Sequence, residues 1–216
     1  MNEYIASLEK EFSLIKNGFK EEEKRALTDY KSNDNGQSKK LAFLAYQSGV
    51  YQVRMYAVFL FGYLSKNEKI LIFMRDEVSK DDNWRIQEVL AKAFDEFCKK
   101  TGYEKSLPII DEWLNNTNPN TRRAVVEGLR IWTSRSYFKD NPNEAIRRIA
   151  DLKEDMNEYV RKSVGNALRD ISKKFPELIK SELNKWKLES KEINQVYKLA
   201  SKLIKINNIK IKENSK

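Results

Sequence analysis

Acidic and basic side chains recur at helical spacing in the middle of this chain. In residues 118–132, NPNTRRAVVEGLRIW, the residues Arg123, Glu127 and Arg130 lie three and four positions apart and share one helical face. A carboxylate held beside guanidinium groups can stabilise a developing positive charge or orient an attacking water molecule. The alternative is a solvated face that carries ordinary i,i+4 ion pairs.

Residues 83–97 and 157–171 follow the same plan. Superposing the small residues Ala93, Gly128 and Ala167, which are 35 and 39 positions apart, also aligns the apolar residues around them. This period is typical of stacked helix pairs. The superposition produces three polar columns: Glu88, Arg123 and Lys162; Lys92, Glu127 and Asn166; Asp95, Arg130 and Arg169. Asp170 follows Arg169, the last residue of the third column. In a solenoid such columns form a continuous surface, here basic in sum.

Helical periodicity extends over nearly the whole chain, without convincing strand alternation. The expected helices cover residues 4–15, 19–30, 39–49, 50–64, 67–78, 106–114, 144–152, 176–186 and 190–206, besides the three aligned segments. We expect Asn120 to cap the helix that follows Asn118-Pro119, and residues 32–38 to form a connection. The sequence therefore predicts an all-α, HEAT-like solenoid with a concave basic face. It forms one domain over residues 1–206, and residues 207–216 form a disordered basic tail.

Composition restricts the chemistry. Lys and Arg exceed Asp and Glu by 41 to 32, and the net charge of +9 favours a polyanionic partner such as nucleic acid. The absence of histidine excludes Ser-His and Cys-His nucleophile pairs and His-ligated metal sites, so we expect no metal and no cofactor. The lone Cys98 cannot form an intrachain disulfide, which fits a reducing cytoplasm, and we expect it in the core. The longest apolar run, residues 56–64, is far too short to span a membrane.

Residues 83–176 resemble the HEAT-like repeat DNA alkylation repair proteins, the AlkC and AlkD group. The segments NEYVRKSVGNALRDISKKFPEL and VVEGLRIW carry the resemblance. It implies a monofunctional DNA glycosylase that removes positively charged alkylated bases, of the 3-methyladenine or 7-methylguanine type, from duplex DNA. Such a base is already a good leaving group, so the reaction requires neither histidine nor metal. A carboxylate near the sugar would stabilise the charge that develops as the bond breaks.

The resemblance also implies site residues. Trp84 and Glu88 match the AlkD-type tryptophan and the acidic residue four positions later, with glutamate in place of aspartate. Arg123 matches a DNA-contacting arginine, and Asn166 stands where that type has a second tryptophan. Glu88, Glu127 and Asp170 fall at or near the carboxylates of the AlkC type. The chain has no room for the additional DNA-clasping domain that the AlkC type often carries.

We therefore predict Glu88 as the main catalytic carboxylate, with Glu127 and Asp170 assisting. Trp84 and Asn166 are the predicted substrate-binding residues, although Trp84 could instead pack at the helix start. The predicted phosphate contacts are Arg123, Arg130, Lys162 and Arg169.

Two other functions stay open: a catalytically silent DNA-binding relative, and a protein–protein scaffold. We expect a monomer in the cytoplasm that associates with the nucleoid when it binds DNA. Trp132 aligns with Phe97 and Ile171 and is predicted to lie in the core.

Overall fold

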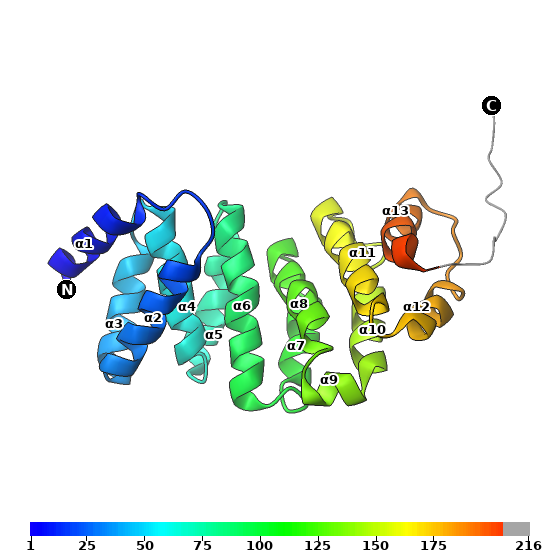
Figure 1. Cartoon of the computed structure of the whole chain (residues 1–216), viewed down its shortest axis with the longest axis horizontal. Coiled ribbons are helices and arrows are strands. Elements are labelled where there is room, and N and C mark those ends of the chain that lie inside the picture. Colours follow the sequence, from blue (N-terminus) through cyan, green and yellow to red (C-terminus); the bar gives the residue numbers. More distant parts are fainter. Residues whose placement is uncertain (205–216) are drawn as a thin grey trace. The chain divides into compact units, whose positions relative to one another are not determined.

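The structure is a computed structural model that describes residues 1–204, and within them it is all-helical with no β-strand (Figure 1). The α-helices are α1 (Asn2–Phe12), α2 (Lys20–Ser32), α3 (Asn35–Tyr46), α4 (Tyr51–Leu64), α5 (Glu68–Asp76), α6 (Trp84–Thr101), α7 (Leu107–Leu114), α8 (Pro119–Trp132), α9 (Ser136–Asp140), α10 (Pro142–Ala150), α11 (Glu158–Ser172), α12 (Pro176–Leu183) and α13 (Lys191–Ala200). Two 3-10 turns, η1 (Val78–Lys80) and η2 (Ser201–Leu203), complete them. The predicted HEAT-like, all-α helical-repeat class is confirmed.

The chain divides into two compact units, and the division falls inside α8, after Gly128. The first unit comprises residues 1–128 and the second begins at Leu129. The predicted single domain over residues 1–206 and the predicted concave basic face both stay predictions. The predicted basic tail at residues 207–216 lies outside the described residues.

The first unit is organised around α4, which packs against α2, α3 and α6. The unusually apolar sequence of α4 explains this position, since Val53, Tyr56 and Leu60 are fully buried. Gly62 allows α6 to approach closely. A Cβ atom at Gly62 would lie 2.9 Å from the Cα atom of Ala93, so even alanine would force the two helices apart.

The second unit is organised around α11, which packs against α10, α12 and α13. Its close approach to α13 depends on Gly165. A Cβ atom there would lie 2.6 Å from the Cβ atom of Leu199 and 3.2 Å from the carbonyl oxygen of Val196. Each unit therefore has one glycine that lets its central helix contact a neighbour at short range.

The helices α6, α8 and α11 begin with the same asparagine cap. The side-chain oxygens of Asn83, Asn118 and Asn157 accept hydrogen bonds from the backbone N–H two residues later, at 3.0, 2.9 and 2.9 Å. The backbone N–H of each capping asparagine in turn donates to a side-chain oxygen two residues earlier. These acceptors are Asp81, Asn116 and Asp155, at 2.9, 2.8 and 2.8 Å. The loops before these three helices therefore repeat the same hydrogen bonds, just as the helices repeat the same sequence pattern.

A side chain four residues after each cap binds the carbonyl groups of the preceding loop. Arg122 donates to the carbonyls of Asn116 and Thr117, and Arg161 donates to those of Asp155 and Met156. Gln87 does the same on α6, with Nε2 bonded to the carbonyls of Val78 and Asp81. These bonds satisfy backbone acceptors where the chain reverses, and they hold each helix start in a defined place.

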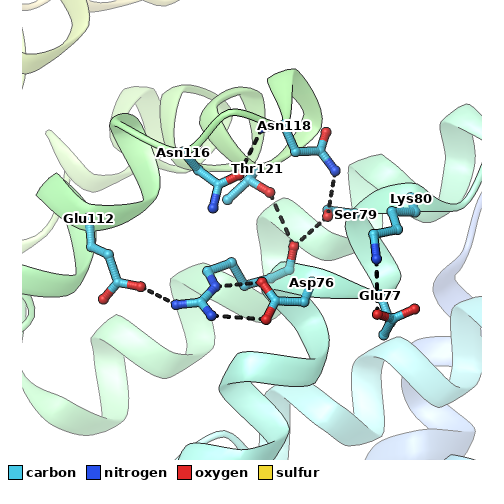
Figure 2. A network of polar contacts seen from close by, with 9 residues as sticks. Asp76, Glu77, Ser79, Lys80, Glu112, Asn116, Asn118 and Thr121 are labelled. Carbon is cyan, nitrogen blue, oxygen red and sulfur yellow. Dashed lines mark hydrogen bonds and ion pairs between the residues drawn. The ribbon is translucent and has the colours of Figure 1, made fainter.

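A polar network joins the end of α5 to the start of α8 inside the first unit (Figure 2). The guanidinium of Arg75 binds both carboxylate oxygens of Asp76 and forms an ion pair with Glu112 on α7. Asn118 donates to the hydroxyl of Ser79 at 2.8 Å (Figure 2). Asn120 donates to the Ser79 carbonyl at 2.9 Å. The same asparagine that caps α8 therefore also fixes α8 to the preceding repeat.

Three details of the predicted elements are wrong. Asn118, and not Asn120, caps α8, because Pro119 has no N–H to satisfy and its fixed φ suits the first helical position. Residues 32–38 are not one connection, since α3 begins at Asn35 and Asp34 caps it by accepting from Gln37 at 2.8 Å. The short helix α9 was not expected at all.

The core predictions for two residues are confirmed. Trp132 is fully buried and stacks on Phe138. Cys98 is fully buried as well, and burial raises the pKa of its thiol well above the ordinary value, as expected of an unreactive core residue. In the part of the chain that the structure describes, no helix has the length and apolar character needed to cross a membrane.

Candidate functional site

The first candidate group lies on the first turns of α6. Trp84 is the first residue of this helix and leaves 58% of its surface exposed, which is unusual for so large an apolar side chain. The guanidinium of Arg85 lies 4.4 Å from the Trp84 ring and 5.1 Å from the ring of Tyr51, at the start of α4. An exposed indole that already holds a cation is a surface suited to a positively charged aromatic ligand.

Glu88 follows Trp84 by one helical turn and is exposed. Its i+4 neighbour Lys92 could have neutralised it, but the Lys92 ammonium lies instead 4.7 Å from the ring centroid of Phe19. Within residues 1–204, Glu88 forms no ion pair and no side-chain hydrogen bond. Its carboxylate is therefore available to a ligand, one turn away from the exposed indole.

The second candidate group is the pair on α8 that belongs to the first unit. The Arg123 guanidinium lies 3.9 Å from a carboxylate oxygen of Glu127, and the side chains are 22% and 16% exposed. This is the i,i+4 ion pair expected from the sequence spacing. Glu127 is thus less accessible than Glu88 and already has a cationic partner.

The third group surrounds Asp170 in the second unit. Its carboxylate oxygens lie 3.1 Å from the Lys173 ammonium, 3.4 Å from the Arg169 guanidinium and 3.8 Å from the Arg130 guanidinium. Partial burial alone would raise the pKa of Asp170. The hydrogen bond from Lys173 and the charges of the three cations outweigh burial and lower that pKa below its ordinary value.

The remaining predicted residues on α11 are more ordinary. Lys162 forms an ion pair with Glu158 at 2.7 Å and lies over the ring of Tyr159. The hydrogen bond between them lowers the pKa of the Glu158 carboxyl and raises the pKa of the Lys162 ammonium. Asn166 is half-buried on the same helix. Neither residue has an arrangement that identifies a ligand.

Of the predicted residues, the structure therefore brings Arg123 to Glu127, and both Arg130 and Arg169 to Asp170, while Glu88 lies one helical turn after Trp84. Each of the three predicted polar columns, such as Glu88, Arg123 and Lys162, joins residues of different units. The columns therefore stay predictions. Sequence reasoning missed Arg85 and Lys173. Arg85 could have been found because it is adjacent to Trp84, and Lys173 because it lies three residues after Asp170.

Among residues 1–204, no group of three or more His, Cys, Asp or Glu side chains is placed to hold a metal ion. The candidate groups contain only carboxylates, cations and aromatic rings. This set can bind an anionic backbone and a flat cationic ring, and it can stabilise positive charge.

Comparisons with known proteins agree with the helical-repeat fold. The family model described as DNA alkylation repair enzyme matches residues 18–204, which is most of the chain. The chain belongs to this family. Its sequence is 80% identical to AlkD2 from Streptococcus mutans, whose crystal structure superposes with a TM-score of 0.94 and covers 95% of this chain and 99% of that one.

A second solved structure, that of smu.31 from Streptococcus mutans UA159, is 79% identical in sequence to this chain, with a TM-score of 0.89 over 94% of this chain and 98% of that one. A curated relative is the uncharacterized protein YhaZ of Bacillus subtilis, 34% identical over 87 residues. That match covers 38% of this chain and 24% of the relative, so the chain corresponds to about a quarter of YhaZ.

Proposed function

We propose that this family member is a DNA glycosylase that excises positively charged alkylated bases, of the 3-methyladenine or 7-methylguanine type, from duplex DNA. The observation that carries the proposal is the pairing of Trp84 and Glu88 on α6. One is an exposed indole with a cation against its ring, and the other is an exposed carboxylate without a partner among the described residues. Family membership supports the same chemistry.

In the proposed reaction, the indole of Trp84 attracts the cationic base by a cation–π interaction, worth roughly 0.5 to 2 kcal/mol. The Arg85 guanidinium beside that ring moves away or leaves the opposite face to the base. As the glycosidic bond breaks, its electrons go to the base, which leaves neutral, and the sugar becomes positively charged. Glu88 stabilises that charge, orients the water that attacks the sugar and accepts the proton that this water loses.

Affinity for the duplex comes from cations that contact phosphates. The three cations that face Asp170, namely Arg130, Arg169 and Lys173, are the first candidates for these contacts. Arg123 and Lys162 supply further candidate contacts after exchanging their carboxylate partners for phosphate. A duplex-binding repair protein would act in the cytoplasm, in association with the nucleoid.

The decisive measurement is single-turnover release of methylated base from duplex DNA by wild-type protein and by Glu88→Gln. The substitution keeps size and removes charge, so base release should fall at least about tenfold, corresponding to about 1.4 kcal/mol. Duplex affinity should stay the same or increase. Glu23→Gln on α2 is a control carboxylate that should leave release unchanged.

A second function, silent DNA binding, is favoured by one observation. Two of the three candidate carboxylates, Glu127 and Asp170, already have cationic partners, which leaves Glu88 without assistance. If wild-type protein binds duplex DNA with steep salt dependence but releases no base from any alkylated duplex, this second function replaces the first. Absence of salt-dependent binding would instead favour a protein–protein scaffold.

A further inference from the structure

The first unit also contains a pocket, which lies where the ends of five helices meet. This pocket of about 340 Å³ opens between the last turns of α2, α4 and α6 and the first turns of α3 and α5. None of its lining residues belongs to the Trp84–Glu88, Arg123–Glu127 or Asp170 groups. The proposed glycosylase function makes no use of it.

The charge of the lining is one-sided. Three lysines line the pocket, Lys39, Lys66 and Lys100, and the lining residues that the structure describes include no Asp or Glu. Lys39 and Lys66 form no ion pair with any residue in 1–204. The nearest acid to Lys100 is Glu96, whose carboxylate lies 3.7 Å from the ammonium. Lys39 and Lys66 therefore line the pocket without an acidic partner, and the Lys39 ammonium lies 6.0 Å from the ring centroid of Phe43.

The inner wall is preorganised. Lys100 is only 23% exposed, and its ammonium donates to the Tyr63 carbonyl at 2.5 Å. The same ammonium lies 4.7 Å from the ring of Tyr30 and 5.5 Å from the ring of Tyr63, and the two rings are 5.4 Å apart. These contacts fix a long, flexible side chain in one position, which lowers the entropic cost of binding an anion there.

Hydrogen-bond donors of two further kinds reach the pocket. Tyr63 lines the pocket, and its phenol is protonated at neutral pH and can donate a hydrogen bond. Asn67 caps α5 and lines the pocket, so the positive end of that helix dipole lies at its edge. Both features favour a negatively charged ligand that accepts hydrogen bonds.

We propose that this pocket binds the phosphate group of a small phosphate monoester, with Lys39 and Lys66 contacting the phosphate oxygens and Lys100 fixing the depth of entry. The cavity is large enough for a phosphate and a small attached group. The Tyr30 and Tyr63 rings supply an apolar surface for that group.

Isothermal titration of the full chain with inorganic phosphate, and then with adenosine monophosphate, tests the proposal at constant ionic strength. We expect saturable binding of both, with the nucleotide bound more tightly than phosphate. The double variant Lys39→Gln/Lys66→Gln should lose at least about tenfold in affinity for each ligand, because two unpaired cations are removed. Its melting temperature without ligand should match that of wild type.

Lys99→Gln is the matched control, since Lys99 is next to Lys100 on α6 but is 61% exposed and does not line the pocket. The proposal is overturned if neither ligand binds saturably to wild-type protein. It is equally overturned if Lys99→Gln weakens binding as much as the double variant, because the effect would then be one of net charge. Base release from methylated duplex should be unchanged in Lys39→Gln/Lys66→Gln, which separates this proposal from the glycosylase one.

Discussion

Two carboxylates, one in each unit, have their pKa values shifted in opposite directions. Glu22 on α2 is fully buried, and neither of its oxygens has a hydrogen-bond partner among the described residues. Burial and the charge of Glu21 raise its pKa. Asp170 on α11 is also partly buried, but three cations surround it and its pKa is lowered.

The difference shows that burial of a carboxylate has no fixed effect on stability. The surrounding groups decide whether the charged form is favoured. Glu22 favours its protonated form and destabilises the folded first unit when it is charged. Asp170 favours its charged form, because it separates cations that would otherwise repel one another. Glu88 is exposed and has no partner among residues 1–204, so its carboxylate is available for chemistry.

The largest expected effect concerns Glu22. Replacing it by methionine keeps its length and removes an unpartnered buried carboxylate, so the free energy of unfolding at pH 7 should rise by about 1 to 3 kcal/mol. Urea unfolding measures this. Glu21→Met on the same turn, where the side chain is exposed, should change stability by less than about 0.5 kcal/mol. A destabilised Glu22→Met would show that the Glu22 charge has a partner in solution.

The pH dependence of the Glu22 effect has a definite sign. The folded pKa is raised above the unfolded value of about 4.3, so the Glu22 contribution is most favourable below that pH. It is lost as pH rises through the folded pKa. Glu22→Gln should therefore match wild type near pH 4 and exceed it increasingly at higher pH. A stability difference that is constant from pH 4 to 8 would contradict this linkage.

Asp170 should behave in the reverse way. Asp170→Asn should lower the free energy of unfolding at pH 7 by about 1 kcal/mol, since Arg130, Arg169 and Lys173 lose their common partner. Because the folded pKa is depressed, the stabilisation is present above the unfolded value of about 3.9 and is lost as pH falls through the folded pKa. Denaturant curves at pH 7 and pH 3 measure both. Asp151→Asn, in an exposed pair with Arg147, is the control that should show little effect.

The helices and their periodicity were predictable because helix formation and burial follow local patterns. The alignment of Trp132 with Phe97 and Ile171 indicated that Trp132 lies in the core. The cap of α8 was placed two residues too late, because Asn118 and Asn120 are both good capping residues and only Pro119 decides between them. The glycine and asparagine at residues 35–36 suggested a loop. They are tolerated because they lie in the first turn of α3, after the Asp34 cap.

The candidate site was predictable only in part. Helical spacing placed Glu88 one turn from Trp84, and it paired Arg123 with Glu127 correctly. The i,i+4 spacing of Glu88 and Lys92 does not produce an ion pair, because the Lys92 ammonium lies against the ring of Phe19, the residue that precedes α2. The cations around Asp170 come from two helices and a following turn, so their meeting depends on tertiary packing. Burial of Glu22 could be read only from its i,i+4 relation to Ala26, which is also buried.

The smallest expected effect tests the loop repeat common to both units. Asn157 accepts hydrogen bonds from two backbone N–H groups, of Tyr159 and Val160, whereas Asn83 accepts one, from Arg85. Asn157→Ala and Asn83→Ala should each lower the free energy of unfolding by about 1 kcal/mol, with Asn157→Ala the more costly by a few tenths. Amide hydrogen exchange at Tyr159 and Val160 should accelerate only in Asn157→Ala. Asn184→Ala, at an exposed helix end, should leave stability within about 0.5 kcal/mol of wild type. If both capping variants behave like this control, the repeated asparagines do not stabilise the helix starts, and the resemblance between the two loops is one of geometry alone.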